Sequence, residues 1–150
     1  MRRKGAKSIV VTDDLKRSVE QAVGRYGVMF AYVFGSAVSG HMREESDIDI
    51  AIYFDPRLSA EEKNQQALAI YGVLAGALTV PEEALDITVL NDASVLIKQV
   101  VMSEGMLIYE RDHEARVEFE LAVMRQRDDE RHYRRLSRQV FLARLAKEGI

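Results

Sequence analysis

The spacing of apolar residues predicts one helix and two buried strands in the first third of the chain. From Thr12 to Arg25, apolar residues recur every three or four positions, as in a helix with one buried stripe. Thr12 or Asp13 is placed to cap its start. Residues 28–34 are almost wholly apolar, which is typical of a strand covered on both faces. Residues 47–54 alternate acidic and apolar side chains, and we expect a second strand there.

The rest of the chain alternates helices with strands. The order predicts an α/β or α+β fold, with a small mixed β-sheet flanked by helices and a long C-terminal helix. The charged pair Asp128-Asp129 marks a point at which that last helix could break. The expected elements are a helix from a capping box at Ser59–Glu62 to about Ala77, a strand over 84–90, a helix capped by Asn91-Asp92 and ending near Ser103, a short edge strand over 106–109, and a helix from Asp112.

Composition indicates one domain. The 150 residues are 47% hydrophobic, enough to bury a core. We place this domain at 12–150, with a helical extension from about 112, behind a basic tail at 1–11. The chain has no cysteine, which excludes disulfides and thiolate metal sites. No apolar run approaches the roughly 20 residues of a membrane span, and no signal-peptide pattern precedes the domain, so we expect a cytoplasmic protein without membrane contact. A net charge of −3 argues against a dedicated nucleic-acid binder.

Three aspartates stand in otherwise apolar strands. Side chains alternate along a strand, so Asp47 and Asp49 point to the same side while Ile48 points to the core. Asp86 lies alone in a second apolar strand, between Leu85 and Ile87. If these strands pair, three carboxylates meet at one end of the sheet, and their repulsion favours a bound cation. Oxygen ligands without Cys or His favour a hard ion, and Mg²⁺ typically binds one or two carboxylates together with substrate phosphates.

A Gly-Ser pair follows the first strand and supplies a second part of the candidate site. Glycine lets the backbone turn sharply at Gly35 and approach a ligand closely. The amide and hydroxyl of Ser36 suit phosphate oxygens. A Gly-Ser pair alone carries little information. Its position between two buried strands, ten residues before Asp47-x-Asp49, makes it far more specific.

These motifs resemble those of the polymerase-beta type of nucleotidyltransferase. Within that superfamily the short chain is similar to the minimal nucleotidyltransferases, and in particular to the MntA-family antitoxins that are paired with HEPN-domain toxins. The resemblance covers roughly residues 12–125. The segments that carry it are Tyr32-Val33-Phe34-Gly35-Ser36, Glu45-Ser46-Asp47-Ile48-Asp49-Ile50-Ala51-Ile52, Leu85-Asp86-Ile87-Thr88-Val89-Leu90-Asn91 and Glu104-Gly105-Met106-Leu107-Ile108-Tyr109-Glu110-Arg111-Asp112.

The resemblance implies the nucleotidyltransferase fold and a specific reaction. Antitoxins of this family transfer AMP from ATP to a tyrosine of the partner toxin, an RNase, and so silence it. Carried over to this sequence, the catalytic aspartates Asp47 and Asp49 would bind two Mg²⁺ ions, and Asp86 would share the ion nearest the attacking hydroxyl. Gly35, Ser36 and Ser46 would contact the triphosphate. The implied partners are ATP and a HEPN-domain toxin, in a hetero-oligomer.

One departure from the family pattern leaves other functions open. Members often carry Arg or Lys before the second glycine of the loop, whereas Ser39 precedes Gly40 here. Loss of that cation would weaken ATP binding or turnover unless Arg43 or His41 replaces it. A purely steric antitoxin is therefore one alternative, although the three aspartates oppose it. Transfer to a small molecule such as an aminoglycoside is another, but those relatives usually have an additional helical domain.

The C-terminal segment offers weaker signals. Residues 125–138 contain six arginines with Asp128, Asp129 and Glu130 among them, a mixture typical of a solvated helix face. Contact with a partner or RNA is the alternative. Arg127 and His132 have the spacing of the HEPN ribonuclease motif, which chance explains as well. Apolar residues at helical spacing predict packing within the chain, or a partly covered interface with another protein. They are Leu121, Met124, Leu136, Val140, Phe141 and Leu145.

Overall fold

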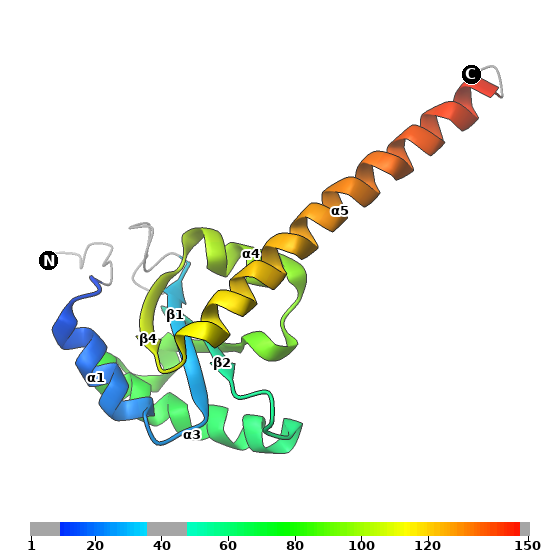
Figure 1. The fold of residues 1–150 in the computed structure, drawn as a ribbon. Helices are drawn as coiled ribbons and strands as arrows, with labels where there is room; N and C mark the ends of the chain where they lie inside the picture. The colour runs from blue at the N-terminus through cyan, green and yellow to red at the C-terminus, as the bar shows by residue number, and fades with distance from the viewer. Residues whose placement is uncertain (1–9, 36–47, 148–150) are drawn as a thin grey trace, which may run out of the picture.

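The computed structural model describes residues 10–35 and 48–147 (Figure 1). Its centre is a four-stranded mixed sheet in the order β3-β2-β1-β4. β1 pairs antiparallel with β2 and β4, and β2 pairs parallel with β3. This confirms the α+β class and the predicted edge position of the last strand. The strands are β1 (Val28–Phe34), β2 (Ile48–Phe54), β3 (Leu85–Val89) and β4 (Met106–Glu110).

Helices α1 (Asp13–Val23) and α3 (Ala60–Leu78) cover one face of the sheet. Thr12 caps α1 by accepting a hydrogen bond from the Leu15 amide, and Ser59 begins α3 with a full capping box. Both caps were predicted. The alternation along β2 places its isoleucines on this side, where their burial removes apolar surface from water and stabilises the fold. Ile48, Ile50 and Ile52 are all buried there.

The other face of the sheet is covered by α4 (Val95–Glu104) and the first part of α5 (His113–Lys147). Phe119 packs against Phe30 and Tyr53, with ring centroids 5.4 and 5.5 Å apart. Phe30 and Tyr53 also stack on each other at 4.8 Å. The aromatic cluster therefore fixes α5 on the same face of β2 that carries Asp49.

A polar network beside this cluster also holds α5 on the sheet. The hydroxyl of Tyr32 donates to Glu120, and Arg116 donates to Glu120 at 2.9 Å and to Glu110 at the end of β4. Burial first, and the Glu120 carboxylate second, raise the pKa of Tyr32 well above its usual value. A phenol that stays neutral can keep donating to Glu120 throughout the physiological pH range. The network thus links β1, β4 and α5.

Two predictions about helix ends were wrong. The helix expected from Asn91-Asp92 begins later, because Ser94 is the N-cap of α4 and residues 90–92 form one 3₁₀ turn. The side chain of Asn91 is used elsewhere: it accepts from the Phe54 amide and donates to the Phe54 carbonyl, both at 2.9 Å. The break considered at Asp128-Asp129 is also absent, and α5 is one continuous helix of 35 residues.

The C-terminal part of α5 extends beyond the rest of the chain (Figure 1). We call residues 128–147 the overhang, and the sheet with α1, α3, α4 and residues 113–127 of α5 the body. Of the two predictions for the apolar residues of α5, an interface with another protein stays a prediction, and packing within the chain is wrong for the residues whose side chains are exposed. They are Leu121, Met124, Leu136, Val140 and Phe141. Among the described helices, none is long and apolar enough to cross a membrane.

Candidate active site

The candidate site lies where β1 ends and β2 begins. Gly35 follows β1 with φ of +78°, a conformation that side chains strongly disfavour. A Cβ built on Gly35 would lie 2.4 Å from an oxygen of Asp49, closer than any real contact. Glycine is therefore required at this position both for the turn and for the carboxylate beside it, as the sequence predicted.

Two of the three predicted carboxylates come together. Asp49 of β2 pairs with Phe34 on one side and with Asp86 of β3 on the other. Neighbouring strands lie about 4.8 Å apart, and paired residues of parallel strands point to the same face. Asp49 is half-buried, whereas Asp86 is exposed at the edge of the sheet. The condition set in the sequence analysis, that the two strands pair, is met, and the pairing places Asp49 next to Asp86.

The remaining predicted site residues lie outside the described part of the chain. They are Ser36, Ser46 and Asp47, together with the loop residues Ser39, His41 and Arg43. Their predicted roles stay predictions. The described ranges contain no group of three acidic, histidine or cysteine side chains that could hold a metal ion.

The described donors nevertheless suit a hard divalent cation. Asp49 and Asp86 offer carboxylate oxygens on one face of adjacent strands, and the absence of a side chain at Gly35 lets the Asp49 carboxylate lie against the turn after β1. Mg²⁺ commonly takes only one or two carboxylates from the protein, and phosphates and water complete its shell. Asp49 and Asp86 are therefore suitable ligands for a Mg²⁺ ion that also binds substrate phosphates.

A cleft of about 710 Å³ opens at the opposite end of the same face of β2. Its floor includes Tyr53 and Phe119, and its walls come from the segment after β2 and the starts of α4 and α5. Asp55 and Arg57 pair at its rim, with 2.7 Å between carboxylate and guanidinium. Sequence reasoning missed the cleft, because its lining comes from segments far apart along the chain. Its other charged side chains are Lys63, Lys98, Asp112 and Glu118.

A comparison with known protein families identifies the family of this chain. Residues 18–114 match the family model described as polymerase beta, nucleotidyltransferase. The matched range contains Gly35, Asp49 and Asp86, the residues that meet at the edge of the sheet. This chain belongs to that nucleotidyltransferase family.

The chain is also similar to a protein adenylyltransferase and to chains of solved toxin–antitoxin complexes. One is a protein adenylyltransferase MntA of Aphanizomenon flos-aquae, 31% identical over 81 residues, which are 52% of this chain and 54% of the relative. The match thus spans about half of that curated protein. A solved toxin–antitoxin with AMP-PNP aligns with a TM-score of 0.59 at 20% identity, over 87% of this chain and 99% of the other. A Shewanella oneidensis complex of a tri-AMPylated HEPN toxin with MNT antitoxin aligns with a TM-score of 0.54 at 18% identity. The alignment covers 85% of this chain and 96% of the other. At these identities the solved structures show a shared fold.

Proposed function

We propose that this chain transfers AMP from ATP to a tyrosine hydroxyl of a HEPN-domain toxin and thereby acts as its antitoxin. The observation that carries the proposal is the pairing of Asp49 with Asp86 beside Gly35, in a chain of the nucleotidyltransferase family. Its relatives supply the acceptor class: one is a protein adenylyltransferase, and another is bound to an AMPylated HEPN toxin. The proposed assembly is a hetero-oligomer in the cytoplasm, where ATP is available.

In the proposed reaction the tyrosine oxygen attacks the α-phosphorus of ATP. The new bond joins this oxygen to phosphorus, the bond from the α-phosphorus to the bridging oxygen breaks, and pyrophosphate leaves. Asp49 and Asp86, with Asp47, would hold two Mg²⁺ ions that neutralise charge on the phosphates. Gly35, Ser36 and Ser46 would contact the triphosphate.

The exposure of Asp86 gives it a distinct role in this proposal. Asp49 is half-buried between two strands, whereas Asp86 is exposed on the edge strand, where its carboxylate is open to a protein acceptor. In the proposed reaction this carboxylate accepts the proton that the tyrosine loses, directly or through one water molecule. Most of the rate enhancement would come from alignment and charge compensation.

Small-molecule transfer is the second candidate, and the cleft is the observation that bears on it. Its volume suits a drug-sized ligand, and Asp112 and Glu118 would attract a cationic one. However, the cleft lies around Tyr53, four residues along β2 from Asp49, or roughly 13 Å at the rise of a strand. An acceptor hydroxyl must lie within about 3.5 Å of phosphorus to react. A ligand confined to the cleft would not reach that position, so we favour a protein acceptor.

The test is intact mass spectrometry of the HEPN-domain protein encoded at the same locus, after incubation with this chain, ATP and Mg²⁺. We expect one or more added adenylates, none with Asp49→Asn, and unchanged modification with Asp92→Asn. The control makes the same chemical change at an exposed carboxylate outside the site. A stable complex without modification would instead support a steric antitoxin. Absence of both would exclude this partner and lead to a screen of small-molecule acceptors.

A further inference from the structure

The face of α5 that packs on the body continues into the overhang. A helix returns to the same face every three or four residues. Phe119 and Val123 lie on this face in the body and are 9% and 1% exposed. The same spacing leads to Val140 and Phe141, which are 58% and 57% exposed. Together with Leu136, Ser137 and Arg144 they line a shallow apolar hollow, which we call the apolar face of the overhang.

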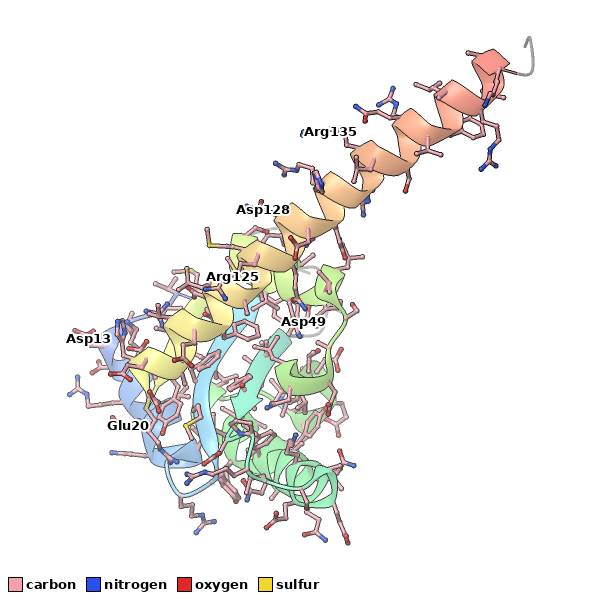
Figure 2. All side chains as sticks on the ribbon, turned by 45° about the vertical axis from the view of Figure 1, so that its right-hand side comes forward. Asp13, Glu20, Asp49, Arg125, Asp128 and Arg135 are labelled. Atoms are coloured by element: carbon pink, nitrogen blue, oxygen red, sulfur yellow. The ribbon has the colours of Figure 1, made fainter. Side chains whose placement is uncertain are left out.

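The overhang leaves the body at the end of the sheet that carries the candidate site. β1 runs toward Gly35, and α5 follows the same direction: its start lies beside the end of β4, Glu120 binds Tyr32, and Arg127 lies beside Ser103 at the end of α4. Figure 2 shows Asp49 on the side of the sheet that α5 covers, with Asp128 and Arg135 farther along the helix. The overhang then continues for about 30 Å, at 1.5 Å per residue.

A row of arginines borders the apolar face on one side. Arg127, Arg131, Arg134 and Arg138 recur at intervals of four, three and four residues, so they share one side of the helix. All four are exposed, and Glu130 accompanies Arg134 at 3.8 Å. We call these four residues the arginine row. A partner that covers the apolar face would place its own flank against the row, and acidic residues on that flank would be attracted to it.

We propose that the apolar face and the arginine row bind one amphipathic helix of the acceptor protein, whose apolar stripe is flanked by acidic residues. Binding there would hold the acceptor beside Asp49 and Asp86, so that its hydroxyl meets the nucleotide at high effective concentration. This inference rests on the proposed function, because it assumes a protein acceptor. A second copy of this chain fits the surface less well, since an antiparallel pair of overhangs would bring the two arginine rows together.

Two exposed apolar residues of α5 provide a matched test. Phe141 belongs to the apolar face and is 57% exposed, whereas Leu121 is 43% exposed and lies on the side of the helix away from both the apolar face and the arginine row. Serine at either position removes apolar surface without adding charge near the arginine row. With the full chain and the HEPN-domain protein of the same locus, Phe141→Ser should raise the KM for the protein acceptor, and the Kd of the complex, at least tenfold. It should leave kcat and the affinity for ATP and Mg²⁺ within about twofold. Leu121→Ser should leave all four quantities within about twofold.

Charge reversal tests the arginine row in the same way. Arg138→Glu should weaken acceptor binding and reduce its dependence on salt, because one attraction to an acidic flank becomes a repulsion. Arg125, also exposed, lies on the opposite side of the same helix from the row, so Arg125→Glu should have a much smaller effect. Circular dichroism of each variant checks that its helix content matches the parent chain.

The outcomes separate this inference from the proposed function. Equal KM values for the Phe141 and Leu121 variants, with adenylylation intact, would overturn the docking surface and leave the function standing. A complex that forms only with Phe141 intact, yet without adenylate transfer, would support the surface and refute the function. If light scattering shows the chain alone to be a dimer that Phe141→Ser dissociates, then a second copy covers the face and the proposal is wrong.

Discussion

At the scale of single residues, Gly35 leaves space for the carboxylate of Asp49, the proposed metal ligand. Its positive φ and the short approach of Asp49 leave no room for a side chain. Gly76, inside α3, has a helical conformation, and a Cβ added there would meet no atom within 4 Å. Replacement by alanine should therefore be unfavourable at Gly35 and favourable at Gly76.

We expect Gly35→Ala to lower the free energy of unfolding by about 1–3 kcal/mol, from the left-handed backbone alone. The clash should also displace Asp49 and weaken binding of a non-hydrolysable ATP analogue with Mg²⁺. Gly76→Ala should raise stability by about 0.4–1 kcal/mol and leave nucleotide binding unchanged. Urea unfolding and calorimetric titration measure the two effects. Equal stability of the two variants would contradict the role given to Gly35.

The pKa of Asp55, at the rim of the cleft, is lowered by its neighbour Arg57. Arg57 binds Asp55 through its side chain and its backbone amide, and these hydrogen bonds lower the pKa of Asp55 to about 2. Because the folded-state pKa is depressed, the stabilisation is present above the ordinary value near 4 and is lost as the pH falls toward 2.

Arg57→Gln should return the pKa of Asp55 toward its ordinary value, as followed by NMR of its side-chain carboxyl carbon. Arg17→Gln removes the partner of Asp14 on α1 instead and should leave Asp55 unchanged. A pKa that stays near 2 in the Arg57 variant would show that another group holds the carboxylate in its charged form.

At the scale of elements, the strands and the first two helices could be predicted because their periodicity matches their burial. β1 is apolar throughout since both faces are covered, and β2 alternates since Asp49 and Ile50 face opposite layers. The start of α4 could not be predicted, because the side chain of Asn91 binds the backbone of Phe54, a contact between distant segments. Apolar spacing in α5 indicated a helix correctly. It could not show that the same face is covered at Phe119 and open at Phe141.

The candidate site was predictable to the extent that it depends on local patterns. Alternation along β2 and the lone acid of β3 indicated that Asp49 and Asp86 would meet if the two strands paired, and the pairing itself is seen only in the structure. The cleft around Tyr53 depends on how α5 crosses the sheet, which no local pattern encodes.

The buried ring of Phe119 contributes more to the attachment of α5 to the sheet than the exposed side chains of this helix do. Phe119→Ala removes a ring packed against both Phe30 and Tyr53, and we expect it to lower the free energy of unfolding by about 3–5 kcal/mol. Leu121→Ala, on the exposed side of the same helix, should change it by less than about 0.5 kcal/mol. Denaturant unfolding of both variants gives the comparison. Equal losses would mean that Leu121 is covered in solution, and would point to self-association through that side.

At the scale of the whole molecule, the body and the overhang have different sources of stability. The body has buried layers on both faces of its sheet. In the overhang no described side chain is buried, so its helix depends on residues of high helix propensity and on local pairs such as Arg134 with Glu130. Most helix stability in proteins comes from tertiary packing, which the described side chains of the overhang lack, so the overhang is the part of the chain that a partner would stabilise most.

Removal of the overhang should therefore separate binding of the acceptor from folding and from nucleotide binding. A chain that ends at Arg127 keeps the buried Phe119 and Val123, and we expect its melting temperature to stay within about 5 °C of the parent's, since few contacts are lost. Its affinity for ATP and Mg²⁺ should be unchanged, because Gly35, Asp49 and Asp86 remain in place. Its complex with the HEPN-domain protein should be lost.

Hydrogen exchange supplies an independent check on the parent chain. Amides of 131–147 should exchange much faster than those near Val123, and should become protected when the acceptor binds. If the shortened chain fails to fold, or if those amides are already protected without a partner, then the overhang is covered in the free protein, and its open face is not available to an acceptor.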